Sequence, residues 1–239
     1  MRRALVTGGS GALGGAICRR LAADGHHVYV HASTGMPRAT AVAAEIIAAG
    51  GAAEAVVFDV TDRAATSQAL ERLLAIGPLQ ILVNNAGIHD DAVMPGMSHE
   101  QWSRVIDVSL NGFFNVTQPL LMPMIQTRWG RIVNISSVSA LIGNRGQANY
   151  AAAKSGLHGA ARALAVELAS RGITVNVVAP GIIASPATEK IFPKETIERL
   201  VPMKRAGTPD EVAELVSFLA SERAAYISGQ VVSINGAMI

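Results

Sequence analysis

Hydrophobic residues along this chain fall into short, unbroken runs that are separated by longer segments with helical spacing. Runs that are apolar throughout, rather than alternating with polar residues, are typical of strands buried on both faces of a sheet. They predict seven strands, at residues 4–7, 28–32, 55–58, 79–83, 131–135, 173–178 and 230–234.

The segments between these runs predict helices. Capping-box spacing occurs at Ser98 to Gln101 and at Thr208 to Glu211, and glycines end several segments. The predicted helices cover residues 16–21, 37–49, 61–76, 98–125 and 208–220, together with the segment that carries Tyr150 and Lys154. Strands alternating with helices predict an α/β protein: one domain over residues 1–239, built as a doubly wound parallel sheet (Rossmann fold) of about seven strands with helices on both faces.

Residues 182–201 interrupt this pattern. They follow Pro180-Gly181, contain two further prolines, and show no clean period before residue 195. We expect a mobile segment that covers a substrate site, with an ordinary surface connection as the alternative.

Composition narrows the possible functions. The chain has 239 residues, 50% of them hydrophobic and 16% charged, which suits one domain with a large core. The net charge of +2, without any block of like charge, gives no electrostatic basis for binding nucleic acid. No apolar run approaches the ~18 residues of a membrane helix, and the N-terminal residues do not resemble a signal peptide. We therefore expect a cytoplasmic protein that is not bound to a membrane and holds no metal. Cys18 is the only cysteine and is expected to be packed in a helix.

Glycines cluster between the first predicted strand and the first predicted helix, in Gly8-Gly9-Ser10-Gly11-Ala12-Leu13-Gly14. A turn at this place aims backbone N–H groups and a helix N-terminus at a pyrophosphate. Asp59 ends the third strand and Asn84-Asn85-Ala86-Gly87 the fourth. Because the carboxyl ends of parallel strands form the ligand edge of such a sheet, we expect a dinucleotide there.

The end of the second strand indicates which dinucleotide is bound. An acidic residue there would bind the ribose 2′-hydroxyl and repel a 2′-phosphate, but the strand ends in His31-Ala32-Ser33-Thr34. Ser33 and Thr34 can donate hydrogen bonds, and Arg38 is near in sequence. The pattern favours NADPH over NADH, although Arg38 could equally be a solvated helix residue.

Tyr150 and Lys154 lie one helical turn apart and so share a face. An ammonium near a phenol lowers the pKa of the phenol. Lowering it from ~10 to about 7 needs ~4 kcal/mol, so a second cation such as an oxidised nicotinamide should contribute. A hydroxyl also ends the fifth strand, but spacing alone does not choose among Ser136, Ser137 and Ser139.

Taken in order, these residues resemble the short-chain dehydrogenase/reductase family over essentially the whole chain. The matching positions are Thr7-Gly8 to Gly14, Asp59, Asn84 to Gly87, Asn111, Ser137, Tyr150, Lys154 and Pro180-Gly181. Within the family, residues 146–154, 170–181 and the ending Val-Ser-Ile-Asn-Gly-Ala-Met resemble the bacterial 3-oxoacyl-[acyl-carrier-protein] reductases. Residues 88–91 suggest a specialised branch, such as reductases of polyene or polyketide pathways.

The resemblance implies the role of each catalytic residue. Tyr150 would give a proton to the ketone oxygen and Ser137 would orient the carbonyl. Lys154 would lower the phenol pKa and bind the nicotinamide ribose, and Asn111 would hold a water that connects Lys154 to solvent. The implied cofactor contacts are Gly8, Ser10, Gly11, Ala12, Leu13, Gly14, Ser33, Thr34, Asp59, Val60, Asn85, Ala86, Gly87, Tyr150, Lys154, Pro180, Gly181, Ile183 and Ser185.

Three positions depart from the family pattern. Ala12 stands where the family has its second motif glycine, and Gly11 stands where NADP-dependent members often have arginine. Ser185 takes the place of the usual threonine after Pro180-Gly181. These changes leave more of the 2′-phosphate binding to Ser33, Thr34 and Arg38.

The resemblance also implies an NADPH-dependent reduction of a 3-oxoacyl thioester, with the substrate on an acyl carrier protein that docks at Arg128 and Arg171. The alternatives are an alcohol or sugar dehydrogenase acting on a free small molecule, or a non-catalytic nucleotide-binding scaffold. Small residues at Ala152, Gly156, Gly159 and Ala163 predict a subunit interface, in keeping with the homotetramers of the family; close packing within one subunit is the alternative. Leu157, Ala161, Leu164 and Leu168 fall on a face that suits the sheet.

Overall fold

The computed structural model describes residues 1–239, except for the side chains of residues 187, 189 and 190. Its seven strands form one sheet in the order β3-β2-β1-β4-β5-β6-β7, and every pairing is parallel. The strands are β1 (Arg3–Val6), β2 (His27–Ala32), β3 (Ala52–Val57), β4 (Ile81–Asn84), β5 (Gly130–Ile135), β6 (Ile173–Pro180) and β7 (Val231–Ile234). The strand order reverses between β1 and β4, which is where such a sheet opens a ligand crevice.

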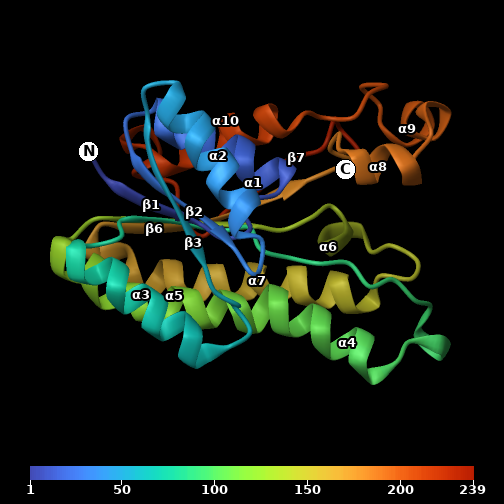
Figure 1. Ribbon diagram of the computed structural model, residues 1–239. Coiled ribbons are helices and arrows are strands. Elements are labelled where there is room, and N and C mark those ends of the chain that lie inside the picture. Colours follow the sequence, from blue (N-terminus) through green and yellow to red (C-terminus); the bar gives the residue numbers. More distant parts are fainter.

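Helices cover both faces of the sheet (Figure 1). They are α1 (Ala12–Ala23), α2 (Met36–Ala48), α3 (Arg63–Ile76), α4 (His99–Ile106), α5 (Gly112–Thr127), α6 (Ser139–Ile142), α7 (Ala148–Leu168), α8 (Pro186–Ile191), α9 (Lys194–Leu200) and α10 (Pro209–Ala220). One core joins the sheet to α1, α2 and α10, and the other joins it to α3, α5 and α7. Ala4 and Val6 of β1 enter the first core and Leu5 enters the second, so this strand is buried on both sides.

The architecture confirms the doubly wound parallel sheet that the apolar runs predict. Helix α1 begins at Ala12, four residues before the predicted start and within the glycine cluster. Among the strands, the largest boundary error is in β3, which begins three residues before its predicted start because Ala52 and Ala53 pair with β2, although exposed Glu54 follows them. The predicted helix 98–125 is continuous but contains a π-helical turn at Asp107–Asn111, between α4 and α5. The π turn advances the helix by an extra residue and so changes which side chains face inward.

The segment 182–201 folds into α8 and α9 beyond the carboxyl ends of the strands, near the C-terminus (Figure 1). The Ser185 hydroxyl begins α8 by accepting a hydrogen bond from the Thr188 amide at 3.0 Å. The mobility of the segment stays a prediction.

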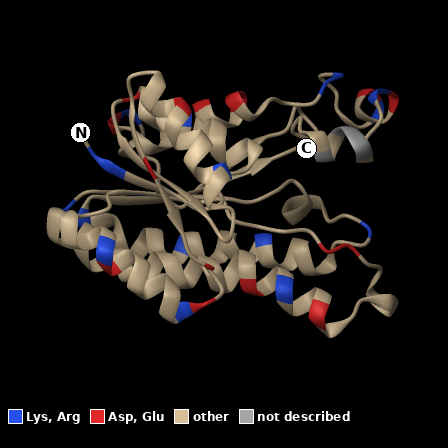
Figure 2. Ribbon diagram, viewed as in Figure 1, with Lys and Arg blue, Asp and Glu red and all other residues tan. Residues whose placement is uncertain are grey.

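Charged side chains of both signs are interspersed over the helices of both layers (Figure 2), in keeping with the small net charge. In the part of the chain that the structure describes, no helix is long and apolar enough to cross a membrane.

Candidate active site

The glycine turn between β1 and α1 is held by backbone geometry. Gly8 has a φ of 64°, in the left-handed region that favours glycine. A Cβ on Gly14 would lie 2.2 Å from the Gly8 carbonyl oxygen, so no side chain fits there. The N-cap residue of α1 is Gly11, which has no side chain to accept a hydrogen bond. The first N–H groups of the helix therefore remain available to an anion.

The end of β4 is fastened to the same turn. The Thr7 hydroxyl accepts hydrogen bonds from the amides of Asn85 and Ala86, each at 3.0 Å. The Asn85 side chain donates to the carbonyl oxygens of Thr7 and Gly8, at 2.9 and 3.2 Å. These bonds hold two of the predicted cofactor segments side by side at the switch point.

His31, on β2, holds the glycine turn in place, a role that the sequence did not reveal. Its Nδ1 accepts from the Gly8 amide at 3.0 Å, and its Nε2 lies 2.8 Å from the Phe58 carbonyl oxygen. Burial lowers the pKa of His31 to about 4, so the ring is neutral and Nε2 carries the proton that the carbonyl accepts. His31 therefore fastens the turn to β2 and to the end of β3.

The residues that follow β2 and β3 lie near this turn and can contact an adenosine. Ser33 and Thr34 are exposed at the end of β2, and the Arg38 guanidinium folds back against Gly35 in the same connection. Asp59 at the end of β3 accepts from the Thr61 amide and hydroxyl through Oδ1, at 2.9 and 2.8 Å. Val60 is buried beside Gly112, so any contact with a ligand there would come from its backbone.

Ser137, Tyr150 and Lys154 line one cavity of about 740 Å³ at the carboxyl edge of the sheet. The Lys154 ammonium donates to the Ile135 carbonyl oxygen at 2.8 Å and lies 5.8 Å from the centre of the Tyr150 ring. The cavity also borders the glycine turn through Ala12 and Leu13, and the fourth strand through Asn85 and Gly87. The structure thus brings Ala12 and Lys154, which are 142 residues apart in the sequence, to the same cavity.

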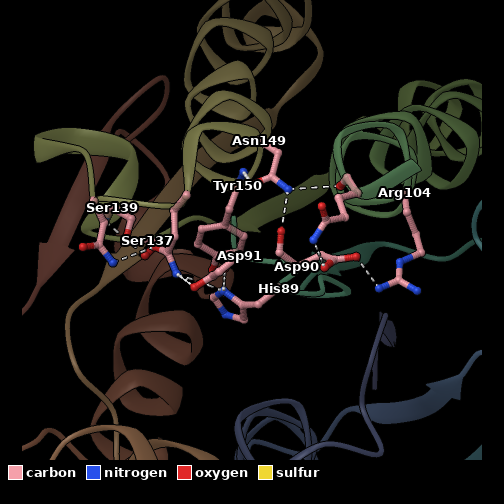
Figure 3. A network of polar contacts seen from close by, with 11 residues as sticks. His89, Asp90, Asp91, Arg104, Ser137, Ser139, Asn149 and Tyr150 are labelled. Carbon is pink, nitrogen blue, oxygen red and sulfur yellow. Dashed lines mark hydrogen bonds and ion pairs between the residues drawn. The ribbon is translucent and has the colours of Figure 1, made fainter. Parts of the chain in front are cut away.

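The structure also chooses among the three serines. The Ser136 hydroxyl is buried, where it bonds His158 Nε2 at 2.7 Å and donates to the Lys154 carbonyl oxygen. The Ser137 hydroxyl instead lies beside Tyr150 (Figure 3) and accepts from the Ser139 amide at 3.1 Å. Ser137 is therefore the hydroxyl that can contact a ligand together with the phenol.

The expected effect of Lys154 on the tyrosine is absent in the protein alone. Burial raises the pKa of Tyr150 to about 12, a side-chain interaction with Ser137 lowers it, and the Asp91 carboxylate raises it. Burial also lowers the pKa of Lys154 to about 8. Desolvation of the phenol therefore dominates in the protein alone, and the depressed pKa that includes a cofactor cation stays a prediction.

Asn111 does not join the other three predicted catalytic residues. It is exposed, and its side chain donates to Asp107 Oδ1 at 2.7 Å. Ser109 and Lys154 instead both approach Gly87: a Cβ on Gly87 would be 3.0 Å from Lys154 Nζ and 3.5 Å from Ser109 Oγ. The Ser109 hydroxyl is buried and has no hydrogen-bond partner among the described residues. Residues two apart on a helix lie on different faces, so a shift of two in the motif register selected the wrong side chain.

The connection after β6 closes the cavity. The Gly181 amide donates to the Ile234 carbonyl oxygen at 2.9 Å, and a Cβ on Gly181 would lie 2.8 Å from the Asn235 Cα. Pro180, Gly181, Ile183 and Ser185 all line the cavity, and their contact with a cofactor stays a prediction.

The two predicted docking arginines lie at the opposite edge of the sheet. Arg128 ends α5 just before β5, and Arg171 precedes β6. Arg128 donates to the Ser170 carbonyl oxygen at 2.9 Å, so the two arginines are neighbours. The active-site cavity begins at the other ends of these strands, and eight residues of β6 span about 26 Å at ~3.3 Å per residue. Within one subunit the two arginines therefore lie away from its cavity, and their docking role stays a prediction.

A network of polar side chains lies around Tyr150 (Figure 3). The His89 ring stacks on the Tyr150 ring with the centroids 4.1 Å apart. Gln147 donates to Asp91 Oδ2 at 2.8 Å, and Arg104 and Gln101 donate to the two carboxylate oxygens of Asp90. The network joins the connection after β4 to α4 and to the start of α7.

A glycine turn at the switch point of a parallel sheet, with a serine, a tyrosine and a lysine in the adjoining cavity, defines a nicotinamide-dependent oxidoreductase. The sequence model of the short chain dehydrogenase family matches residues 2–196, and the chain belongs to this family. The chain is 45% identical, over 98% of both sequences, to the 3-oxoacyl-[acyl-carrier-protein] reductase FabG of Aggregatibacter actinomycetemcomitans. It is 44% identical to the 3-oxoacyl-[acyl-carrier-protein] reductase of Synechocystis sp., covering 99% of this chain and 96% of the relative. It is 43% identical to the acetoacetyl-CoA reductase of Acinetobacter sp., covering 98% and 96%.

Proposed function

We propose that this protein reduces a 3-oxoacyl thioester to the 3-hydroxyacyl thioester with NADPH. The observation that carries the proposal is the meeting of Ser137, Tyr150 and Lys154 in one cavity beside the glycine turn. The names of the relatives, which include 3-oxoacyl-[acyl-carrier-protein] and acetoacetyl-CoA reductases, support this substrate class.

When bound, NADPH supplies the hydride that reduces the ketone carbon. Tyr150 gives the proton to the ketone oxygen, and its pKa of about 12 in the protein alone keeps it protonated and able to donate. Ser137 donates a second hydrogen bond to the same oxygen, where negative charge develops. The Lys154 ammonium stabilises the tyrosinate that remains until it is reprotonated.

The reprotonation path passes through Ser109 rather than Asn111. The Ser109 hydroxyl is buried and lacks a partner among the described residues, and both it and Lys154 Nζ approach the Cα of Gly87 where a Cβ would stand. Buried hydroxyls almost always find a hydrogen-bond partner, and a water between the two groups would provide one. Such a water would link Lys154 to solvent, the role that the resemblance gives to Asn111.

NADPH is favoured over NADH by the end of β2. This edge carries the hydroxyls of Ser33 and Thr34 and the guanidinium of Arg38, which lies against Gly35. A guanidinium and hydroxyl donors suit a 2′-phosphate, whereas a carboxylate would suit the 2′-hydroxyl of NADH.

The acyl group is held between the connection before α7 and the segment 182–201. Apolar side chains line this part of the cavity, namely Ile142, Phe192 and Leu200. Closure of the segment over the substrate would exclude water from the reacting carbonyl.

Delivery by an acyl carrier protein, and assembly into a homotetramer, are parts of the same proposal. Arg128 and Arg171 lie far from the cavity of their own chain, so a carrier docked there would have to reach the cavity of another subunit. On α7, Ala152, Gly159 and Ala163 are exposed, whereas a Cβ on Gly156 would press on Leu110 at 3.0 Å within the same chain. An interface on this helix would therefore use three of the four predicted small residues.

The direct test is NADPH oxidation with an acetoacetyl thioester, comparing Tyr150→Phe with Tyr226→Phe. Removing the Tyr150 hydroxyl should lower kcat at least ~100-fold while cofactor binding persists, because general acid catalysis typically contributes that much. Tyr226 is fully exposed, and its phenylalanine variant should match the wild type. Substantial residual turnover by Tyr150→Phe would overturn the general-acid role.

Two further experiments test carrier docking and the oligomeric state. Charge reversal at both Arg128 and Arg171 should weaken turnover of carrier-bound substrate and spare small thioester mimics. Equal losses on both substrates would exclude docking at these residues. Sedimentation at micromolar protein should give a tetrameric mass, and a monomeric mass would exclude the interface on α7.

A further inference from the structure

The His89 side chain packs against the catalytic tyrosine and lines the same cavity. One face of the imidazole stacks on the Tyr150 ring, with the centroids 4.1 Å apart and the planes 30° apart. The ring is otherwise exposed and lines the same cavity as Ser137 and Tyr150. A ligand whose carbonyl oxygen meets the Tyr150 hydroxyl therefore has His89 as its neighbour.

Hydrogen bonds in the network fix which nitrogen of His89 carries the proton. Asn144 Nδ2 donates to Gln147 Oε1 at 3.1 Å, which identifies the carbonyl end of that amide. The amide nitrogen of Gln147 then donates to Asp91 Oδ2 at 2.8 Å and lies 3.5 Å from His89 Nδ1. Because Nδ1 faces this donor, the contact favours the neutral tautomer in which Nδ1 accepts and Nε2 carries the proton.

The Nε2–H group of His89 has no partner among the residues that the structure describes. Around the ring, Asp91 lies 4.0 Å from Nδ1, too far for a hydrogen bond, and Lys154 is the nearby cation. Burial and Lys154 lower the pKa of His89, while Asp91 raises it. The neutral ring thus presents one N–H donor that the protein does not use.

We propose that His89 Nε2–H donates to the second carbonyl oxygen of a 1,3-dicarbonyl substrate and so selects 3-oxoacyl thioesters over simple ketones. The inference rests on the proposed function, because it places the 3-oxo group at Ser137 and Tyr150. One methylene separates the two carbonyl carbons of such a substrate, so their oxygens lie within a few ångströms of each other. The imidazole and phenol rings, with centroids 4.1 Å apart, are likewise within a few ångströms of each other.

This arrangement gives the enzyme a reason to hold an exposed histidine rigidly. Gln147 is buried, and its amide connects Asn144 and Asp91 to the imidazole. Asn149 donates to the Asp90 carbonyl oxygen at 2.9 Å, and the Ala92 amide donates to the Gly146 carbonyl oxygen at 2.9 Å. A donor held on both sides is pre-organised for a second oxygen, which favours selectivity.

The test compares two substrates across variants of His89. One substrate is the acetoacetyl thioester of N-acetylcysteamine, and the other is the thioether ketone in which a methylene replaces the thioester carbonyl. In His89→Phe the aromatic ring can still stack on Tyr150 but the donor is lost. The ratio of kcat/KM for the thioester to that for the thioether ketone should fall about tenfold, the worth of one neutral hydrogen bond.

Matched variants separate this role from others. His89→Gln keeps an N–H donor and should preserve more of the ratio than His89→Phe does. His99→Phe changes an exposed histidine of α4 and should leave the ratio unchanged. An unchanged ratio in His89→Phe, with both substrates affected equally, would overturn the inference, as would a Gln variant as impaired as Phe. Failure of the wild type to reduce the thioester at all would instead overturn the proposed function.

Discussion

The two halves of the active site are held in different ways. The cofactor half, from Gly8 to Gly14 with Asn85, is fixed by glycines that leave no room and by bonds to backbone groups. The substrate half, from His89 to Asp91 with Asn144 and Gln147, is fixed by side chains that meet across loops. Backbone geometry demands particular residues at particular spacings, whereas side-chain networks can be built from many combinations. The first half can therefore be read as a motif, and the second cannot.

The largest test of this difference adds one methyl group to the cofactor turn. In Gly14→Ala, the new Cβ would lie 2.2 Å from the Gly8 carbonyl oxygen, so the turn must move. We expect cofactor affinity to fall roughly 100-fold, since overpacking costs about 3 kcal/mol in a tight site. Fluorescence titration with NADPH measures the change, and thermal unfolding reports whether the fold survives.

Gly11→Ala is the matched control. Gly11 has a φ of −85°, and the atom nearest to its Cβ would be 3.4 Å away, an ordinary approach. This variant should bind cofactor within a few-fold of the wild type. Equal losses in the two variants would show that general loosening of the turn, rather than the contact at Gly14, is responsible.

The same difference explains how much could be predicted from the sequence. The seven strands, the glycine turn and the Tyr150–Lys154 pair follow from apolar runs, glycine spacing and helical periodicity, which act locally. Ser109 was missed because the π turn and a two-residue register decide which side chain faces Lys154. His31 was missed because its partners are the Gly8 amide and the Phe58 carbonyl, and backbone partners leave no mark in the sequence.

The edge of the sheet at which Arg128 and Arg171 lie is a further feature that was not predicted. Arg128 and Arg171 match a family pattern, but a pattern does not say at which edge of the sheet a residue lies. The sequence could have shown it, because both residues directly precede strands and must lie at the amino edge. The raised pKa of Tyr150 could not be predicted from the sequence in this way, since it depends on how deeply the phenol is buried in the folded protein.

The second test concerns Lys154, which lies between the two halves. Burial lowers its pKa to about 8, so the free protein loses this positive charge as the pH rises through 8. If the cofactor binds the ammonium form, binding takes up a proton, and affinity for NADPH should fall by up to tenfold per pH unit above about 8. Calorimetric titration between pH 6.5 and 9.5 measures the slope.

Lys154→Met supplies the comparison for that slope. The variant has no charge to lose, so its affinity should be weaker and flat across the same range. A wild type that shows no slope would mean that Lys154 makes no charge-dependent contact with the cofactor.

The third test breaks the substrate half alone. Gln147→Ala removes the amide that joins Asn144 to Asp91 and His89, and leaves partly buried polar groups without partners. We expect KM for the acetoacetyl thioester to rise about tenfold while cofactor affinity stays the same. Gln126→Ala, on an exposed part of α5, should leave both unchanged. A loss of cofactor affinity in Gln147→Ala would show that the two halves are coupled.

The smallest effect is expected at the rim of the same network. Arg104 donates to Asp90 at 2.5 Å, but its side chain is 56% exposed, and Asp90 keeps a second donor in Gln101. Exposed ion pairs contribute at most ~1 kcal/mol and are screened by salt. Arg104→Ala should therefore lower the free energy of unfolding by less than that amount in urea titrations. The deficit should shrink at high salt, and Arg72→Ala on exposed α3 serves as the control. A larger and salt-independent loss would mean that even the rim of the substrate half is part of its framework.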